Sequence, residues 1–159
     1  MENKHDFEAR YGEPRGLVKL SPTVRPSGPF LCYSDASMCE RGSAYGIIVI
    51  NNAQVFRCES GMFDLEADNS IAAELLAMTK ALSFVPNSVG GTSYSDLENI
   101  SSLLLMETNS RKYDELVTRL NDELGRTNCI AKYLPKNLRD DYYFECHKMA
   151  RKARRKCIY

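Results

Sequence analysis

The stretch from Pro29 to Asn52, PFLCYSDASMCERGSAYGIIVINN, constrains the fold more than any other part of the chain. Two runs of strand-forming residues flank a short polar turn, and the second run, GIIVI, is apolar enough for a strand buried on both faces. We predict strands over Phe30–Asp35, Ser43–Ile50 and Gln54–Ser60, with turns at 36–42 and Asn51-Asn52. Three strands in a row with short turns predict an antiparallel meander.

Strict alternation along the third strand would place Val55, Arg57 and Glu59 on one face and Phe56 and Cys58 on the other. After this strand, apolar residues recur at helical spacing and alternate with short strand runs. We predict helices over 69–84, 97–105, 113–125 and 140–156, and strands over 92–95 and 129–134, with Asn69 or Ser70 capping the first helix and Gly125 ending the third. The order β-β-β-α-β-α-α-β-α predicts an α/β fold: a five-stranded mixed sheet, its first three strands antiparallel, flanked by helices.

The 159 residues fit one domain, and an apolar fraction of 43% suffices for one sizeable core. Residues 1–28 combine Pro and Gly with little periodicity, so we predict an N-terminal arm or linker followed by a domain over 29–159. The six cysteines form no C-x-x-C pair, so we expect neither a disulfide framework nor a structural zinc site. Without a membrane-length apolar run or a secretory signal, we expect an intracellular protein, cytoplasmic or, in a eukaryote, nuclear.

Charge is balanced overall, at 21 Lys and Arg against 21 Asp and Glu, but it is unevenly distributed. From Arg126 to Tyr159 there are ten Lys and Arg against three Asp and Glu. This asymmetry favours a basic C-terminal surface facing an anionic partner, with nucleic acid as the first candidate. The alternative is an ordinary solvated helix face.

Three carboxylates, Asp35, Glu74 and Asp96, are the candidate chemical groups. Asp35 ends a predicted strand, where an aspartate is most often a turn or capping residue. Glu74 flanks the apolar stripe of its helix without Lys or Arg at i±3 or i±4, so it needs a metal ion or a distant cation. Asp96 follows a strand and opens a helix, which suits an N-cap but is also where open α/β sheets place their sites.

As a set, the three carboxylates are more specific than any one of them, because each comes from a different predicted element. Oxygen-rich clusters of this kind suit Mg²⁺ or Mn²⁺. Two such ions about 4 Å apart can activate a water and stabilise the leaving oxygen of a phosphodiester. The pattern therefore predicts a site for two divalent ions.

The segments YSDAS, GSAYGIIV, AELLAMTKAL, YSDLENI and KYLPKN…ECHKMARKA resemble the type 1 ribonuclease H family over roughly residues 29–156. The resemblance implies a ribonuclease H-like fold that cleaves the RNA strand of an RNA–DNA hybrid with two divalent metal ions. Asp35, Glu74 and Asp96 match metal-binding positions of the family. Gly46 matches a family glycine on the second strand.

The final helix departs from the family pattern. Alignment of MARKA puts His147 where the family has the aspartate that completes the metal site. Histidine can ligate Mn²⁺ or exchange a proton near neutral pH, and Asp140, about two turns earlier on the same flank, is a possible substitute carboxylate. A surface histidine on a basic helix is the alternative. The loop histidine of the family maps near Asn137, which implies slower turnover or none.

Contacts with nucleic acid are expected at several positions. Ser37 belongs to the D-x-S motif, and Ser70 falls, with Ile71, where the family often has asparagines that touch the minor groove of the hybrid. The basic handle helix of the family is not evident. The predicted nucleic-acid-binding residues are Ser37, Ser70, Lys148, Arg151, Arg154 and Arg155.

Our first interpretation is a metal-dependent ribonuclease H, a monomer acting on an RNA–DNA hybrid or other nucleic acid, away from membranes. Its catalytic and metal-binding residues would be Asp35, Glu74, Asp96 and His147. The alternative is a weak or inactive module of the same fold that binds nucleic acid or a protein, favoured by the missing fourth aspartate. Retention of three carboxylates argues against an inactive module, because their mutual repulsion is a cost without metal. Another nuclease on this fold, an exonuclease or a resolvase, is a third possibility.

Overall fold

The computed structural model describes residues 28–39, 42–63, 69–106 and 111–155, so the predicted N-terminal arm lies almost entirely outside the described residues. The elements are β1 (Phe30–Cys39), β2 (Gly42–Asn51), β3 (Gln54–Met62), α2 (Ser70–Leu82), β4 (Gly91–Ser95), α3 (Ile100–Leu104), α4 (Asp114–Thr127), β5 (Cys129–Tyr133), the 3₁₀ turn η1 (Lys136–Leu138) and α5 (Asp141–Arg155). The predicted order of strands and α-helices is confirmed. None of the described helices is long and apolar enough to cross a membrane.

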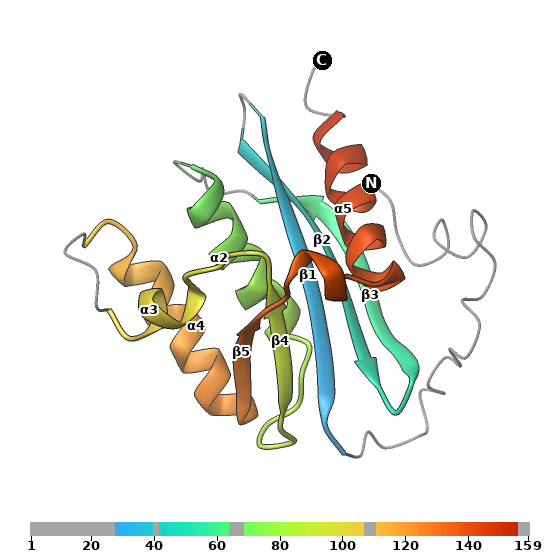
Figure 1. Cartoon of the computed structure of the whole chain (residues 1–159), viewed down its shortest axis with the longest axis vertical. Helices are drawn as coiled ribbons and strands as arrows, with labels where there is room; N and C mark the ends of the chain where they lie inside the picture. Colours follow the sequence, from blue (N-terminus) through green and yellow to red (C-terminus); the bar gives the residue numbers. More distant parts are fainter. Residues whose placement is uncertain (1–27, 40–41, 64–68, 107–110, 156–159) are drawn as a thin grey trace.

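One five-stranded sheet, in the order β3-β2-β1-β4-β5, forms the centre of the molecule (Figure 1). The first three strands are antiparallel, as predicted. Strand β4 runs parallel to β1 and β5 runs parallel to β4, which makes the sheet mixed, as predicted. Helices α2 and α4 pack on one face, against side chains such as Ile47 and Val49, and α5 packs on the other, against Ile48 and Ile50. Every residue of β2 is buried, which confirms the prediction of a strand covered on both faces.

The prediction that β1 ends at Asp35 is wrong. Of the predicted turn over 36–42, residues 36–39 belong to β1 and Gly42 to β2, while residues 40–41 lie outside the described residues. The ladder with β2 continues from Asp35, opposite Gly46, to Cys39, opposite Gly42. Pairing with β4 stops at Cys32, opposite Ser93, so the second half of β1 extends beyond its parallel neighbour as one arm of a long hairpin. The polar residues that suggested a turn are partly exposed on this arm. Asp35 therefore lies within a strand.

The connection between β2 and β3 lies one residue later than predicted. Asn51 still pairs with Gln54, and the two turn residues are Asn52 and Ala53, with φ of 53° and 60°. Positive φ at both central residues is the signature of the type I′ hairpin turn, whose twist matches the strands.

The predicted alternation of faces along β3 fails at a β-bulge. Arg57 pairs with Val49 and Val55 pairs with Ile50, which leaves Phe56 as the extra residue. Val55 and Cys58 consequently pack in the same apolar cluster, under α5. Phe56 packs instead against the cluster on the α2 face.

Two helix limits also differ from prediction. The helix predicted over 97–105 is only Ile100–Leu104. Helix α4 passes through Gly125 to Thr127, and Asn128, at φ 59°, takes the left-handed conformation that closes its last turn. Asparagine tolerates this conformation better than most residues, so it takes the position that the sequence pattern assigned to glycine.

Gly46 allows α5 to lie directly on β2. A Cβ at this position would overlap the carbonyl oxygen of Cys146 and lie 2.9 Å from Cβ of Met149. Because Gly46 pairs with Asp35, this close approach brings α5 against the part of β1 that carries the carboxylate. The glycine that matched the family motif thus has a packing reason in this chain.

Candidate active site

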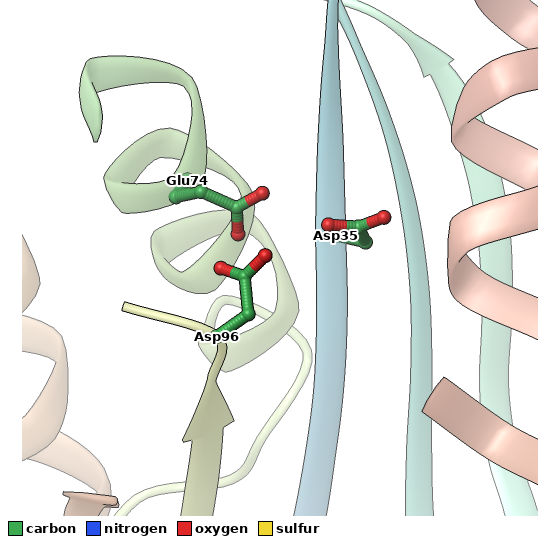
Figure 2. Close-up of side chains that lie close together, drawn as sticks. All are labelled: Asp35, Glu74 and Asp96. Atoms are coloured by element: carbon green, nitrogen blue, oxygen red, sulfur yellow. The ribbon is translucent and has the colours of Figure 1, made fainter. Parts of the chain in front are cut away.

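The carboxylates of Asp35, Glu74 and Asp96 converge at one end of the sheet, as Figure 2 shows. One oxygen from each lies within 4.8 Å of the others. Asp35 comes from β1, Glu74 from α2 and Asp96 from the residue after β4. Strands β1 and β4 are parallel, and Cys32 pairs with Ser93. Three residues further along each chain, Asp35 therefore lies at the level of Asp96.

The start of α2 sets the position of Glu74. The side chain of Asn69 accepts a hydrogen bond from the Ala72 amide at 3.0 Å and caps the helix, as one of the two predicted alternatives. Glu74 is 5% exposed, and its Oε1 accepts from the Ala36 amide of β1 at 3.0 Å. Burial, followed by the charges of Asp35 and Asp96, raises the pKa of Glu74 well above its usual value.

Asp96 does not cap a helix, which was the alternative to a functional role. Helix α3 begins four residues later, at Ile100, with Asn99 at its N-cap position. The turn after β4 is closed by a hydrogen bond from the Leu97 amide to Ser95 Oγ at 3.0 Å. Burial and then the charge of Asp35 raise the pKa of Asp96, while the positive charge of Arg139 opposes that rise.

The carboxylate cluster fits a divalent cation. Glu74 Oε2 and Asp96 Oδ1 are buried and have no hydrogen-bond partner among the described residues. No Lys or Arg of the described residues forms an ion pair with any of the three carboxylates. Three acidic groups this close need a shared proton or a cation between them, and an all-oxygen donor set suits Mg²⁺ or Mn²⁺.

His147 lies at the edge of this cluster. Its Nδ1 is 2.6 Å from Oδ2 of Asp35, a contact between α5 and β1. When the Asp35 carboxylate is ionised it can only accept a hydrogen bond, and Nδ1–H is then the donor in this pair. The His147 side chain is 45% exposed, and no second polar contact to it occurs among the described residues.

Asp140 is not one of the three carboxylates that meet. Its Oδ1 accepts from the amides of Tyr142 and Tyr143 at 3.1 and 3.2 Å, which caps the N-terminus of α5. Its Oδ2 accepts from the hydroxyl of Tyr33 at 2.8 Å. Both oxygens of the possible substitute carboxylate therefore have protein partners.

The residues predicted to contact nucleic acid occupy two regions. Ser37 is partly buried in β1, beyond Asp35, and Ser70 is exposed in the first turn of α2. The others lie on the outer side of α5, opposite its buried Met149, Ala150 and Ala153: Lys148, Arg151 and Arg155 are exposed, and Arg154 is partly buried. We call Lys148, Arg151, Arg154 and Arg155 the basic stripe.

Sequence reasoning missed Arg139 and Tyr143. The Arg139 guanidinium lies 4.6 Å from the centre of the Tyr143 ring, which stacks on the His147 ring at 6.5 Å and 14° between planes. Tyr143 and His147 are four residues apart in α5, which places their side chains on one flank of the helix. That spacing was the available signal for Tyr143. Arg139 precedes α5 with an extended backbone, so helical spacing could not have indicated it.

Comparisons with known proteins identify the fold. Neither a protein-family model nor a curated protein sequence matches the chain. Among solved structures, the N-terminal RNase H domain of a Mycobacterium tuberculosis protein is similar at a TM-score of 0.65 and 12% identity, over 82% of this chain and 96% of that chain. RNase H1 of Halobacterium salinarum is similar at a TM-score of 0.64 and 14% identity, over 81% and 99% of the two chains. The LC11 RNase H1 was isolated from compost and solved in complex with an RNA/DNA hybrid. It is similar at a TM-score of 0.62 and 12% identity, over 82% of this chain and 99% of that chain. At these identities the likeness shows a ribonuclease H fold, as the sequence motifs predicted.

Proposed function

We propose that this protein of ribonuclease H fold is a divalent-metal-dependent endonuclease that hydrolyses the RNA strand of RNA–DNA hybrids. The observation that carries the proposal is the convergence of Asp35, Glu74 and Asp96. Two of them keep a buried oxygen that has no partner in the part of the chain that the structure describes. The fold, shared with RNase H1 enzymes, one of them solved with a bound RNA/DNA hybrid, supports the same function.

Asp35, Glu74 and Asp96 would hold two ions, Mg²⁺ or Mn²⁺. When bound, such ions activate a water and stabilise the leaving oxygen of a phosphodiester. The Ala36 amide engages Glu74 Oε1, so Oε2 is the oxygen left for an ion. The three carboxylates come from a strand, a helix and a strand end that pack together, which holds their geometry before substrate arrives.

His147 has two roles in this proposal. Its Nδ1–H bond fixes Oδ2 of Asp35 and so orients that carboxylate. Its Nε2, without a partner among the described residues, is the atom left to ligate a metal ion or to transfer a proton near neutral pH. A nitrogen ligand favours Mn²⁺ over Mg²⁺, so we expect higher activity with Mn²⁺.

The basic stripe on α5 would bind the substrate backbone. His147 lies on the same helix, one turn before Arg151, so phosphates bound along the stripe continue from the carboxylate cluster. Recognition would rest on the shape of the hybrid, its 2′-hydroxyls and its phosphates rather than on base sequence.

A second candidate function is hybrid binding without cleavage. The observation that favours it is that His147, where the family pattern has a carboxylate ligand, directs Nδ1 to Asp35. In that case the chain would bind the hybrid through the basic stripe, and binding would not depend on divalent ions.

The test is cleavage of an RNA–DNA hybrid labelled on either strand, with Mg²⁺ and Mn²⁺ assayed separately. We expect internal cuts in the RNA strand that Asp35→Asn and Asp96→Asn reduce at least about 100-fold, the scale on which loss of a charge-stabilising catalytic group acts. Asp122→Asn, on the exposed side of α4, is the matched control and should cleave like the wild type.

Metal binding separates the two candidates independently of turnover. A nuclease should gain thermal stability with Mg²⁺ or Mn²⁺, and Asp96→Asn should lose that gain. Binding of hybrid without cleavage in either metal, unchanged by Asp96→Asn and by chelator, would instead support the binding module. Cuts confined to strand ends or to branched DNA would point to an exonuclease or a resolvase.

A further inference from the structure

Arg139 is placed between η1 and α5, at the start of a line of side chains that reaches the carboxylate cluster. Its guanidinium lies over the ring of Tyr143, which stacks on His147, whose Nδ1 bonds to Asp35. Arg139 is partly buried, and its Nε donates to the carbonyl oxygen of Leu134 at 3.3 Å. The side chain is therefore held in place, unlike a freely solvated surface arginine.

Most of the hydrogen-bonding capacity of Arg139 is not used by the protein. Guanidinium has five N–H donors, and among the described residues only Nε has an acceptor. Its two terminal nitrogens make no ion pair with any described carboxylate.

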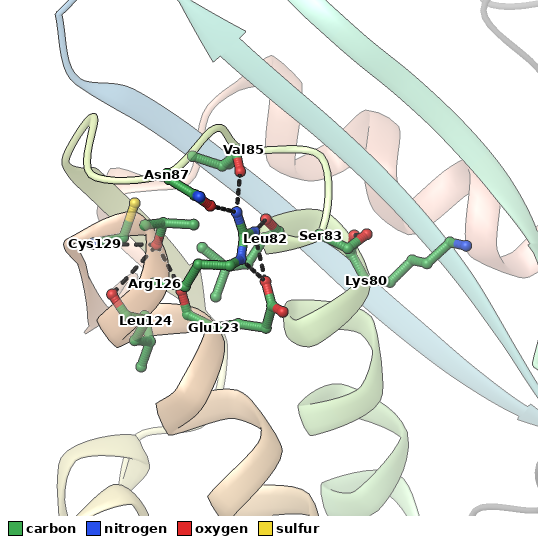
Figure 3. Close-up of polar contacts among 10 residues, drawn as sticks. Lys80, Leu82, Ser83, Val85, Asn87, Glu123, Leu124, Arg126 and Cys129 are labelled. Atoms are coloured by element: carbon green, nitrogen blue, oxygen red, sulfur yellow. Dashed lines mark hydrogen bonds and ion pairs between the residues drawn. The ribbon is translucent and has the colours of Figure 1, made fainter.

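Arg126 shows what a purely structural arginine looks like in this chain (Figure 3). Its Nε and Nη2 bond to Glu123, Nη2 also bonds to the Leu82 carbonyl, and Nη1 bonds to Val85 and Asn87, at 2.6–2.9 Å. All three nitrogens are engaged in joining the end of α4 to the end of α2. Contacts within the protein therefore account for all three side-chain nitrogens of Arg126. For Arg139 they account only for Nε and the stacked face of the guanidinium.

Arg139 carries a positive charge on the same side of the carboxylate cluster as His147. Its guanidinium lies 4.6 Å from the centre of the Tyr143 ring, and Tyr143 stacks on the His147 ring that contacts Asp35. The cluster holds three acidic groups, so an approaching phosphodiester is repelled unless cations offset them. Arg139 is a fixed cation on the α5 side of the cluster, with a fork of donors that matches phosphate oxygens.

We propose that Arg139 is a substrate-binding residue whose terminal N–H groups hold a phosphate of the cleaved strand beside the carboxylate cluster. Tyr143 positions it by supporting the guanidinium plane. The basic stripe follows His147 on α5, and Arg139 lies before the start of that helix. Together they would bind the cleaved nucleic-acid strand on both sides of the carboxylate cluster. This inference rests on the proposed function for the identity of the substrate.

Three variants test the assignment: Arg139→Gln removes the charge, Arg139→Lys keeps the charge but loses the fork, and Lys136→Gln removes a charge from the exposed part of the same loop. Single-turnover cleavage should fall about 10- to 100-fold in Arg139→Gln, as expected for a charged hydrogen bond to phosphate. Arg139→Lys should fall between that variant and the wild type, and Lys136→Gln should change the rate less than about twofold.

The second readout is the binding constant K for the hybrid in the presence of chelator. It is measured by fluorescence anisotropy at several salt concentrations. Loss of one phosphate contact lowers the slope of log K against log salt by about 0.7–0.9, and we expect this change in Arg139→Gln and not in Arg139→Lys. A melting temperature for each variant, with and without Mn²⁺, reports whether the fold and the metal site persist.

A wild-type rate and a wild-type salt slope in Arg139→Gln would overturn the proposal. The proposal would also fail if Arg139→Gln and Arg139→Lys lost the same amount of thermal stability and both kept the wild-type salt slope. That result is expected of a residue that only stabilises the loop. If the wild-type chain binds hybrid without cleaving it, the nuclease proposal fails, and the salt slope still decides the role of Arg139.

Discussion

At the scale of single residues, Glu74 is a buried acidic group with two other carboxylates beside it. Within the described ranges of the chain, its Oε1 has a hydrogen-bond partner and its Oε2 has none. Burial and two like charges favour its protonated form, so in the metal-free protein the Glu74 carboxylate lowers the free energy of unfolding.

Replacing Glu74 by Gln should therefore stabilise the metal-free protein while removing its response to metal. Gln keeps an oxygen for the Ala36 amide and has no charge. We expect a higher melting temperature than the wild type shows in chelator, because the raised pKa of Glu74 makes its ionised form destabilising, and no further rise with Mg²⁺ or Mn²⁺. A lower melting temperature for Glu74→Gln in chelator would contradict this account.

The gain from Glu74→Gln should depend on pH. The folded-state pKa of Glu74 is raised, so its protonated form contributes full stability below the unfolded value of about 4.3, and this contribution is lost as pH rises towards the folded value. The two proteins should thus unfold at similar temperatures near pH 4 and diverge as pH increases towards 7. Thermal unfolding in chelator across that range measures the difference.

At the scale of elements, two glycines have opposite effects on packing. Gly125 lies within α4, where an added Cβ meets no atom within 4 Å, so it costs helix stability without a packing benefit. Gly46 lies in β2 under α5, where there is no room for a Cβ.

Gly125→Ala should stabilise the protein by about 0.5–1 kcal/mol. The residue is helical and exposed, so alanine keeps the backbone conformation and reduces the entropy of the unfolded chain. In urea unfolding, the midpoint concentration should rise, and the slope of the unfolding free energy against urea concentration should stay unchanged. A destabilised Gly125→Ala would mean that the last turn of α4 is not helical.

Gly46→Ala should destabilise the protein by about 1–3 kcal/mol, because the added methyl group forces α5 away from β2. We also expect a disproportionate loss of activity, since α5 carries the His147 that contacts Asp35. The imidazole resonances of His147 in NMR spectra would report the change in contact. Activity that falls only in proportion to the folded fraction would show that α5 does not need this close approach.

At the scale of the whole molecule, the site requires both layers around the sheet. Glu74 comes from the helix layer on one face, His147 from the helix on the other, and Asp35 and Asp96 from the sheet between them. The charge is also divided, with ten Lys and Arg against three Asp and Glu after residue 125. An acidic centre is thus bordered by a basic surface.

The basic stripe should make hybrid binding steeply salt-dependent. Replacing Arg151 and Arg155 together by Gln should lower the slope of log K against log salt by about 1.4–1.8, for two phosphate contacts. The control is Arg111→Gln with Arg119→Gln, which removes the same charge from exposed positions in and near α4. Equal effects of the two double variants would show that net charge, and not the stripe, governs binding.

Much of the fold could be predicted because its signals are local. Helical spacing from Ile71 to Leu82 and the apolar run of β2 depend only on neighbours in sequence, and both elements are confirmed. The errors came where a non-local contact overrides local preference. Pairing with β2 extends β1 past Asp35, a bulge turns Phe56 to the other face, and Asn128 rather than Gly125 closes α4.

The sequence by itself determined the order of the elements and which three carboxylates to examine, because periodicity and residue type are properties of the chain. Only the tertiary structure decided that Asp35 meets Glu74 and Asp96, that His147 bonds to Asp35, and that Asp140 caps a helix instead. These outcomes depend on strand register and on how closely α5 packs over Gly46. Such distances arise between segments far apart in sequence, so no local pattern encodes them.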